Sequence, residues 1–240
     1  MELQKLLSKA RRAAEDYNMI EEGDKIAVGL SGGKDSVTLL QILATMRRFY
    51  PKKYEVVAIS VDMGLGLDEK EVEAVKELCK QLDVEYIVEP THIGEIVFDI
   101  RKEANPCSLC ANMRRGALNN TAVKHGCNKV ALGHHFDDVV ETFMLNLFFE
   151  GRLGCFRPVT YLSRTGITLI RPMIYMPEKD IRYFASKAEL PVIKSPCPAD
   201  GNTERALMKT YLGDFDHRHR GLYKRLVGAL ERSGIDGWSE

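Results

Sequence analysis

The sequence contains no long hydrophobic run. Hydrophobic residues make up 45% of its 240 residues, yet no apolar stretch approaches the ~20 residues that a membrane-spanning helix needs. The N-terminus, MELQKLL, also lacks the apolar core and small-residue cleavage site of a secretory signal. We therefore expect a cytoplasmic protein without a membrane partner, large enough for one domain with a small appendage.

A net charge is also missing, because 34 basic side chains balance 34 acidic ones. The molecule as a whole is therefore not a general binder of polyanions. Only the C-terminal part is locally basic. Such a cluster of basic residues is typical of a nucleic-acid-binding surface, but it is also common on a solvent-exposed helix face. The basic residues of this part are Arg205, Lys209, His217, Arg218, His219, Arg220, Lys224 and Arg225.

A second C-x-x-C is absent, which argues against a four-cysteine zinc site. The single pair, Cys107 and Cys110, opens a predicted helix, where the helix N-terminus favours a thiolate. Alone, the pair is compatible with a redox dithiol, half a zinc site or part of an iron–sulfur cluster. Cys197 adds a third thiol between two prolines. Three cysteines leave one metal position open and favour the iron–sulfur interpretation.

The other cysteines indicate packing rather than chemistry. Cys79 lies on the apolar face of a predicted helix, and Cys127 directly precedes a strand. We predict that both are buried in the core, and we favour a structural role for Cys155.

Short apolar strands alternate with helical patterns, which predicts an α/β fold with a parallel five-stranded sheet and helices on both faces. An N-terminal helix (1–22), a central nucleotide-binding domain (23–195) and a basic helical C-terminal segment with the third cysteine (196–240) follow from this pattern. Strands are expected at 24–30, 54–62, 84–88, 129–133 and 167–170, and helices at 2–20, 37–50, 68–82, 108–126, 136–149, 177–188 and 202–232. The stretches 151–165 and 195–202 are expected to be loops.

The Walker A motif is absent, because Gly33-Lys34 is followed by Asp35 and not by Ser or Thr. Even so, the string GLSGGKDS (29–36) follows an apolar strand and opens a helix, so its backbone N–H groups can bind phosphate. A carboxylate here repels a terminal phosphate unless a metal bridges them, so Asp35 indicates Mg²⁺. The predicted nucleotide-binding residues are Leu30, Ser31, Gly32, Gly33, Lys34, Asp35 and Ser36.

A second polar string, ALGHHFDD (131–138), lies where the fourth predicted strand meets the next helix. Asp137 and Asp138 fall in the first helical turn, where the dipole tolerates negative charge. Either one can hold Mg²⁺ or orient the reacting group, while helix capping explains only one of them. Arg114 and Arg115 follow about one helical turn beyond Cys110. Because they are consecutive, we expect one to reach phosphate or the activated intermediate and the other to lie at the surface or against the sheet.

The string SGGKDS resembles the pyrophosphatase loop of the PP-loop ATPases, which have the adenine nucleotide alpha hydrolase-like fold. This resemblance implies that ATP is cleaved between its α and β phosphates. It also implies that Ser60 and Val61 meet the adenine through their backbone, and that Gly133, His134 and Asp138 complete the nucleotide site.

Together with GHHFDD, the strings CSLCANMRRG (107–116) and RPMIYMPEKDI (171–181), followed by Cys197, resemble the tRNA 2-thiolation (tRNA 2-thiocytidine biosynthesis) family. The resemblance covers about residues 25–200. It implies a [4Fe–4S] cluster on Cys107, Cys110 and Cys197, with tRNA as substrate and a cysteine desulfurase or free sulfide as sulfur donor. A homodimer is compatible with it.

The predicted function is therefore an ATP-dependent tRNA sulfurtransferase that adenylates a base carbonyl, with Asp35, Asp138 and Arg114 as catalytic residues. Three alternatives stay open. One is a tRNA ligase or amidating enzyme of the lysidine-synthetase kind, which needs no cysteines. The others are a cluster-dependent desulfurase that uses no ATP and a nucleotide-sensing or sulfur-carrier module without turnover.

Overall fold

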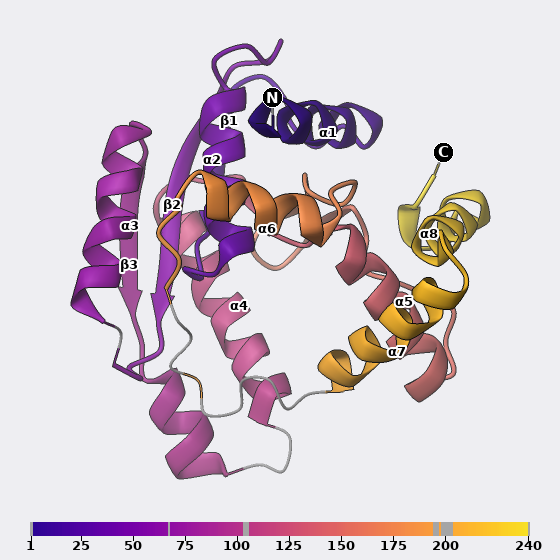
Figure 1. The fold of residues 1–240 in the computed structure, drawn as a ribbon. Helices are drawn as coiled ribbons and strands as arrows, with labels where there is room; N and C mark the ends of the chain where they lie inside the picture. The colour runs from indigo at the N-terminus through magenta and orange to yellow at the C-terminus, as the bar shows by residue number, and fades with distance from the viewer. Residues whose placement is uncertain (1, 67, 103–105, 194–196, 198–203, 240) are drawn as a thin grey trace.

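The computed structural model describes residues 2–66, 68–102, 106–193, 197 and 204–239 (Figure 1). Its sheet has six strands in the order β3-β2-β1-β4-β6-β5. The strands are β1 (Asp24–Gly29), β2 (Tyr54–Asp62), β3 (Glu85–Pro90), β4 (Lys129–Ala131), β5 (Val159–Leu162) and β6 (Ile167–Ile170). The helices are α1 (Glu2–Asp16), α2 (Lys34–Met46), α3 (Glu69–Gln81), α4 (Pro106–Lys124), α5 (Phe136–Phe149), α6 (Glu178–Lys187), α7 (Glu204–Arg218) and α8 (Leu222–Ser233).

Alternating side chains of the central strands build two cores. From β1, Ile26 and Val28 face a large core that also contains buried residues of α1, α2, α3, α5 and α6. Ala27 between them faces the opposite side, where Leu118 and Ala122 of α4 pack. Because both faces are covered, the central strands are apolar throughout, as parallel strands are.

The predicted number of strands was wrong. Strand β5 lies in the stretch expected to be a loop, and it pairs antiparallel with β6 at the sheet edge. Its residues VTYL are half-buried or exposed, and Gly166 at φ 71° closes the hairpin. An edge strand of four residues with polar neighbours leaves little apolar periodicity, which explains why the sequence did not reveal it. The other four pairings are parallel and join strands that the sequence predicted.

Three helical features also differ from expectation. Helix α1 ends at Asp16, and a π-helix spans Glu95–Arg101, where no element was predicted. The basic C-terminal pattern forms two helices, because the chain turns through Gly221 at φ 85° between α7 and α8. Helices α5, α7 and α8 pack against one another and form a group at one side of the sheet (Figure 1).

The order of the strands reverses between β1 and β4. From β1 the chain moves outward to β2 and β3, and then it returns beneath the sheet through α4 to β4. Ligands of open α/β sheets bind at such a switch point, beyond the carboxyl ends of the strands. Both polar strings of the sequence, 29–36 and 131–138, lie there. No helix in the described ranges is long and apolar enough to cross a membrane.

Candidate nucleotide and cysteine site

The GLSGGKDS loop forms a backbone cradle at the end of β1. The N–H of Leu30 donates to the carbonyl of Ile59 at 2.8 Å, which continues the sheet into the loop. Gly32 has a φ of 80°, and its carbonyl accepts a hydrogen bond of 2.9 Å from the N–H of Ile193. Gly33 is then the N-cap of α2. Since the first N–H groups of a helix have no helical acceptor, they point into the cradle as anion donors.

Ser31 and Ser36 stabilise this loop from within. The Ser36 hydroxyl donates to the carbonyl of Gly33 at 2.9 Å and accepts from the N–H of Ser31 at 3.1 Å. Ser36 is buried, whereas Ser31 is exposed and lines the neighbouring cavities. Ser36 therefore shapes the loop, and Ser31 is the hydroxyl that a bound nucleotide can reach.

We predict that Gly32→Ala weakens ATP binding at least about tenfold and lowers the free energy of unfolding by ~1–2 kcal/mol. A Cβ at Gly32 would lie 2.7 Å from Cβ of Ile193, in a left-handed backbone region that disfavours side chains. Gly23→Ala is the matched control, because Gly23 has the same φ of 80° with nothing within 4 Å. Calorimetry with ATP and chemical denaturation measure both effects. Equal ATP affinities for the two variants would show that the close approach at Gly32 is unimportant.

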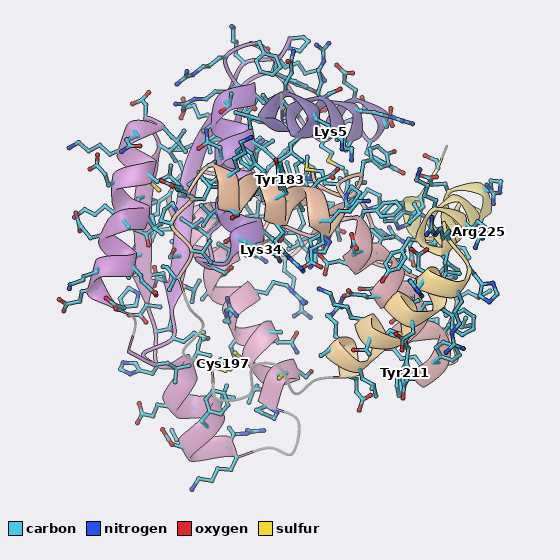
Figure 2. The ribbon with its side chains drawn as sticks, in the orientation of Figure 1. Lys5, Lys34, Tyr183, Cys197, Tyr211 and Arg225 are labelled. Atoms are coloured by element: carbon cyan, nitrogen blue, oxygen red, sulfur yellow. The ribbon has the colours of Figure 1, made fainter. Side chains whose placement is uncertain are left out.

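Lys34 is held by two carboxylates. Its Nζ lies 2.9 Å from Oδ2 of Asp35 and 3.0 Å from Oε1 of Glu178, the first residue of α6. Figure 2 shows Lys34 beside α6. Burial acts to lower the pKa of Lys34, but Asp35 and Glu178 outweigh it and raise that pKa. Lys34 is therefore a fixed cation beside the phosphate cradle. Glu178 was not singled out in the sequence, although it opens a helix in the string RPMIYMPEKDI.

Glu178 also binds helix α7. Its Oε2 accepts a hydrogen bond of 2.5 Å from Lys209 of α7, and Oε1 accepts one of 3.1 Å from Arg182. Burial acts to raise the pKa of Glu178, but Lys209 and Lys34 reverse the sign and lower the pKa to about 2. One carboxylate thus joins the loop after β1 to a helix that is distant in the sequence.

We expect Glu178→Gln to lower the free energy of unfolding by roughly 2 kcal/mol at neutral pH, because Lys34 and Lys209 lose the buried carboxylate that they share. The pKa of Glu178 is lower in the folded protein than in the unfolded chain, so its carboxylate stabilises the fold at any pH above the pKa of the unfolded state. This stabilisation is lost as the pH falls toward about 2. The difference between wild type and variant should therefore shrink below about pH 4.5. Denaturant titrations across this range measure it, with the exposed Glu150→Gln as control. A difference that is independent of pH would contradict this account of Glu178.

Asp35 and Asp138 face the same imidazole. The Nε2 atom of His135 lies 3.8 Å from Oδ1 of Asp35 and 3.4 Å from Oδ2 of Asp138. His135 and Asp138 also form a capping box at the start of α5, since each side chain accepts from the backbone N–H of the other. The Oδ1 atom of Asp35 is buried without a hydrogen-bond partner. An orphaned carboxylate oxygen indicates a missing ligand at this place.

Asp137 points to another helix. Its Oδ2 accepts a hydrogen bond of 2.7 Å from the N–H of Glu178, and burial raises its pKa. Asp137 therefore fixes the start of α6, while Asp138 is the acid that faces Asp35.

A cavity of about 690 Å³ lies beside the phosphate loop. Ser31 lines it together with Ser60, Val61 and Tyr86 of β2 and β3. The Ser60 hydroxyl donates to the carbonyl of Leu30 at 2.7 Å and accepts from the Tyr86 hydroxyl at 3.1 Å. This network joins the end of β2 to the loop after β1, so the structure brings the two predicted parts of the nucleotide site together.

A second cavity, of about 340 Å³, lies between the loop and helix α4. Gly133 and His134 line it, and so do Arg114 and Arg115. We expected only one of these arginines to face the site, but both long side chains reach this cavity. Arg114 also lines the first cavity, so it is common to both. A Cβ at Gly133 would approach the backbone of Asp35 to 3.2 Å, which explains the glycine.

The three candidate metal ligands converge near the N-terminus of α4. Cys107 is exposed, while Cys110 is buried with its Sγ 3.7 Å from Sδ of Met63. Burial raises the pKa of Cys110, neighbouring Cys197 and Cys107 act in the same direction, and Arg114 opposes them. Figure 2 shows Cys197 beside α4. The other residues of the predicted loop 195–202 lie outside the described residues.

The three sulfurs are near enough to influence one another but do not form a closed site. Among the described residues, no group of three or more His, Cys, Asp or Glu side chains is close enough to hold a metal ion. The remaining thiols have the predicted packing role. Cys79, Cys127 and Cys155 are buried, and burial raises the pKa of Cys79 to about 11 and that of Cys155 to about 12.

Two residues of the basic C-terminal cluster turn toward the site. Arg205 lies 3.2 Å from Glu141 and 3.7 Å from Asp138, and Lys209 binds Glu178. The other members of the cluster, His217, Arg218, His219, Arg220, Lys224 and Arg225, are exposed. Arg205 and Lys209 are exposed as well, but they also pair with acidic side chains of the site.

An anion-binding loop and a pair of acids at the switch point of a parallel sheet define a nucleotide-binding α/β protein. The chain belongs to the PP-loop domain family, whose model (ATP_bind_3) matches residues 3–214.

Its relatives share nearly the whole chain. It is 40% identical over 229 residues to a tRNA-cytidine(32) 2-sulfurtransferase of Geotalea uraniireducens, covering 94% of this chain and 90% of the relative. It is 39% identical over 233 residues to the protein of the same name from Pseudomonas putida, covering 95% of this chain and 84% of the relative.

A solved structure supports the same relationship. The U34-tRNA thiolase NcsA from Methanococcus maripaludis, solved with its [4Fe-4S] cluster, is 27% identical with a TM-score of 0.77, covering 96% of this chain and 80% of that chain. The NH3-dependent NAD synthetase from Campylobacter jejuni, 16% identical with a TM-score of 0.52, covers 99% of this chain and 96% of its own. At this identity the second comparison supports the fold alone.

Proposed function

We propose that this protein is an ATP-dependent tRNA sulfurtransferase that adenylates the carbonyl oxygen of a cytidine in tRNA, at position 32 as its relatives' names specify, and replaces this oxygen with sulfur. The observation that carries the proposal is the position of Arg114. It lines both cavities beside the phosphate loop, and it also acts on the Cys110 thiol. The candidate nucleotide site and the candidate site of sulfur transfer therefore share the side chain of Arg114.

The chain's own residues can bind and orient ATP for attack at the α-phosphate. The backbone of Leu30 to Gly33 and the start of α2 bind the phosphates, and Lys34 adds positive charge. Ser60 and Val61 line the cavity that fits the adenosine. Arg114 is placed to compensate the charge that develops as the carbonyl oxygen bonds to phosphorus and pyrophosphate leaves. Residues 23–195 would form the ATP-binding unit, with 1–22 as an N-terminal helical segment and 196–240 as a C-terminal helical segment.

The acids fit a magnesium ion. Asp35 contributes a buried oxygen without a hydrogen bond, and Asp138 contributes a carboxylate on the other side of His135. Carboxylate oxygens are the protein ligands that Mg²⁺ prefers. When bound, Mg²⁺ neutralises charge on the leaving pyrophosphate.

The thiols fit an iron–sulfur cluster. Three cysteines converge, none of them in a disulfide, and two come from the first turn of α4, where the dipole favours thiolates. Cys107, Cys110 and Cys197 would hold a [4Fe–4S] cluster, which supplies a thiophilic iron for the sulfur to be transferred. The sulfur donor is a cysteine desulfurase or free sulfide. The exposed basic residues of α7 and α8 would contact tRNA phosphates, and a homodimer in the cytoplasm is compatible with this arrangement.

The test uses the full chain, purified without oxygen and given ATP, sulfide and bulk tRNA. We expect AMP and pyrophosphate in a one-to-one ratio with 2-thiocytidine. Pyrophosphate release without thiolation, in a protein that joins an amine to tRNA, would favour the lysidine-synthetase kind of enzyme. Thiolation that needs no ATP, or no turnover at all, would contradict the proposal.

A further inference from the structure

A buried arginine fixes the proton of His134. Arg171 follows β6, is 6% exposed, and donates from Nε to Nδ1 of His134 at 3.3 Å. Its NH1 donates to the carbonyl of Arg157 at 2.5 Å. A guanidinium has only donors, so Nδ1 of His134 must supply its lone pair. The neutral imidazole therefore carries its hydrogen on Nε2.

The same contact keeps the ring uncharged. A proton on Nδ1 would face the N–H of Arg171, and the resulting cation would be buried. Burial lowers the pKa of His134 to about 3, and Arg171 is the next largest cause. Three further groups act in the same direction, namely Arg205 from α7, His135 just before α5, and Arg115 from α4. His134 is therefore neutral at any pH at which the protein is expected to work.

Packing fixes the orientation of the ring. The imidazole lies on Phe156 with 4.8 Å between ring centroids, and Phe156 lies 6.3 Å from Trp238, the only tryptophan of the chain. Trp238 is fully buried, and its Nε1 donates to the carbonyl of Phe156 at 2.9 Å. Within the described residues Nε2 of His134 has no hydrogen-bond partner, and the residue lines the second cavity. A neutral donor is thus held rigidly at the cavity wall.

We infer that His134 is a catalytic residue of the sulfur-transfer step, in which its Nε2–H donates to the ring nitrogen next to the base carbon that exchanges oxygen for sulfur. The inference rests on the proposed function. Lys34, Arg114 and Arg115 already supply cations for phosphate, whereas an uncharged donor suits the uncharged acceptor of a base. Arg171 is the positioning residue that selects the hydrogen on Nε2.

The chemistry of this step is balanced without a redox partner. Hydrosulfide adds to the base carbon that carries the AMP oxygen, and the carbon–nitrogen π electrons move to the neighbouring ring nitrogen. The hydrogen bond from His134 stabilises this nitrogen while it holds the electron pair. The sulfur proton then passes to solvent, the electron pair of the S–H bond forms the carbon–sulfur double bond, and AMP leaves with the oxygen and the electron pair of the carbon–oxygen bond, while the ring nitrogen keeps its own pair.

The kinetic test compares His134→Phe with His134→Gln. Phenylalanine preserves the stacking on Phe156 without a donor, whereas glutamine restores an N–H. We expect the Phe variant to lose about 10²-fold more in thiolation rate than in pyrophosphate release, with partial rescue by Gln. His125→Gln, at the far end of α4, is the control. Equal losses in both half-reactions, or thiolation within about threefold of wild type, would overturn the inference.

A spectroscopic test is independent of activity. Nitrogen-15 spectra of the wild type should show His134 as the Nε2–H tautomer, unchanged between about pH 5 and pH 8. In Arg171→Met the same ring should titrate or change tautomer. Trp238 fluorescence reports whether the variant folds. An Nδ1–H tautomer in the wild type would overturn the inference whether or not the variant folds. Absence of tRNA-dependent pyrophosphate release in the wild type would instead sink the proposed function.

Discussion

Asp35→Asn should lower tRNA-dependent pyrophosphate release by about 10³-fold, which corresponds to ~4 kcal/mol of transition-state stabilisation. Its Oδ1 is the buried oxygen without a partner, and its Oδ2 holds Lys34. Asparagine has nearly the same shape, so the loop is expected to stay folded while the cation site is lost. The measurement is initial pyrophosphate release as a function of magnesium concentration.

The control for Asp35 is Asp214→Asn, an exposed position on α7 that removes the same charge. The wild type and this control should show saturable dependence on magnesium, and Asp35→Asn should show none at comparable concentrations. If Asp35→Asn retains a rate within about threefold of wild type, the carboxylate has no part in the reaction.

Replacing Cys110 with alanine should remove iron from the anaerobically purified protein and abolish thiolation, while ATP binding persists. Cys107→Ala and Cys197→Ala should give the same result, because three thiolates would hold the cluster and two bind iron much more weakly. Iron and sulfide analysis, visible absorption and calorimetry with ATP measure these effects together. This combination separates loss of the cluster from loss of the fold.

Cys127→Ala is the matched control, because Cys127 is buried in the core between the sheet and α4 and lines neither cavity. It should keep its iron and its colour at a cost of about 1 kcal/mol in stability. A Cys110→Ala protein that stays as brown as the parent would refute the ligand assignment. Loss of ATP binding in the same variant would show that the thiols support the loop instead.

The phosphate site could be predicted from the sequence because its information is local. A strand, a glycine-rich turn and a helix N-terminus are consecutive, so Ser31 to Ser36 reveal the cradle without any tertiary contact. The same holds for the cysteine pair at the start of α4. Strand β5 could not be found this way, since its short residues at the sheet edge carry little apolar periodicity.

The contacts that complete the site are tertiary and left no local signal. Glu178 lies 144 positions after Lys34 in the chain, yet the two side chains form an ion pair of 3.0 Å. Arg171 likewise determines the tautomer of His134 from another strand. Arg171 follows an apolar strand and Glu178 opens a helix, so their positions in the sequence could have marked both as candidate site residues. The sequence does not indicate which side chains they contact.

The central claim is that the base oxygen attacks the α-phosphate and leaves on AMP. It is tested most directly with tRNA that carries oxygen-18 at the carbonyl of the target cytidine. The account predicts one labelled oxygen in AMP for each thiolated base, with unlabelled pyrophosphate. Unlabelled AMP, or formation of ADP in place of AMP, would contradict it.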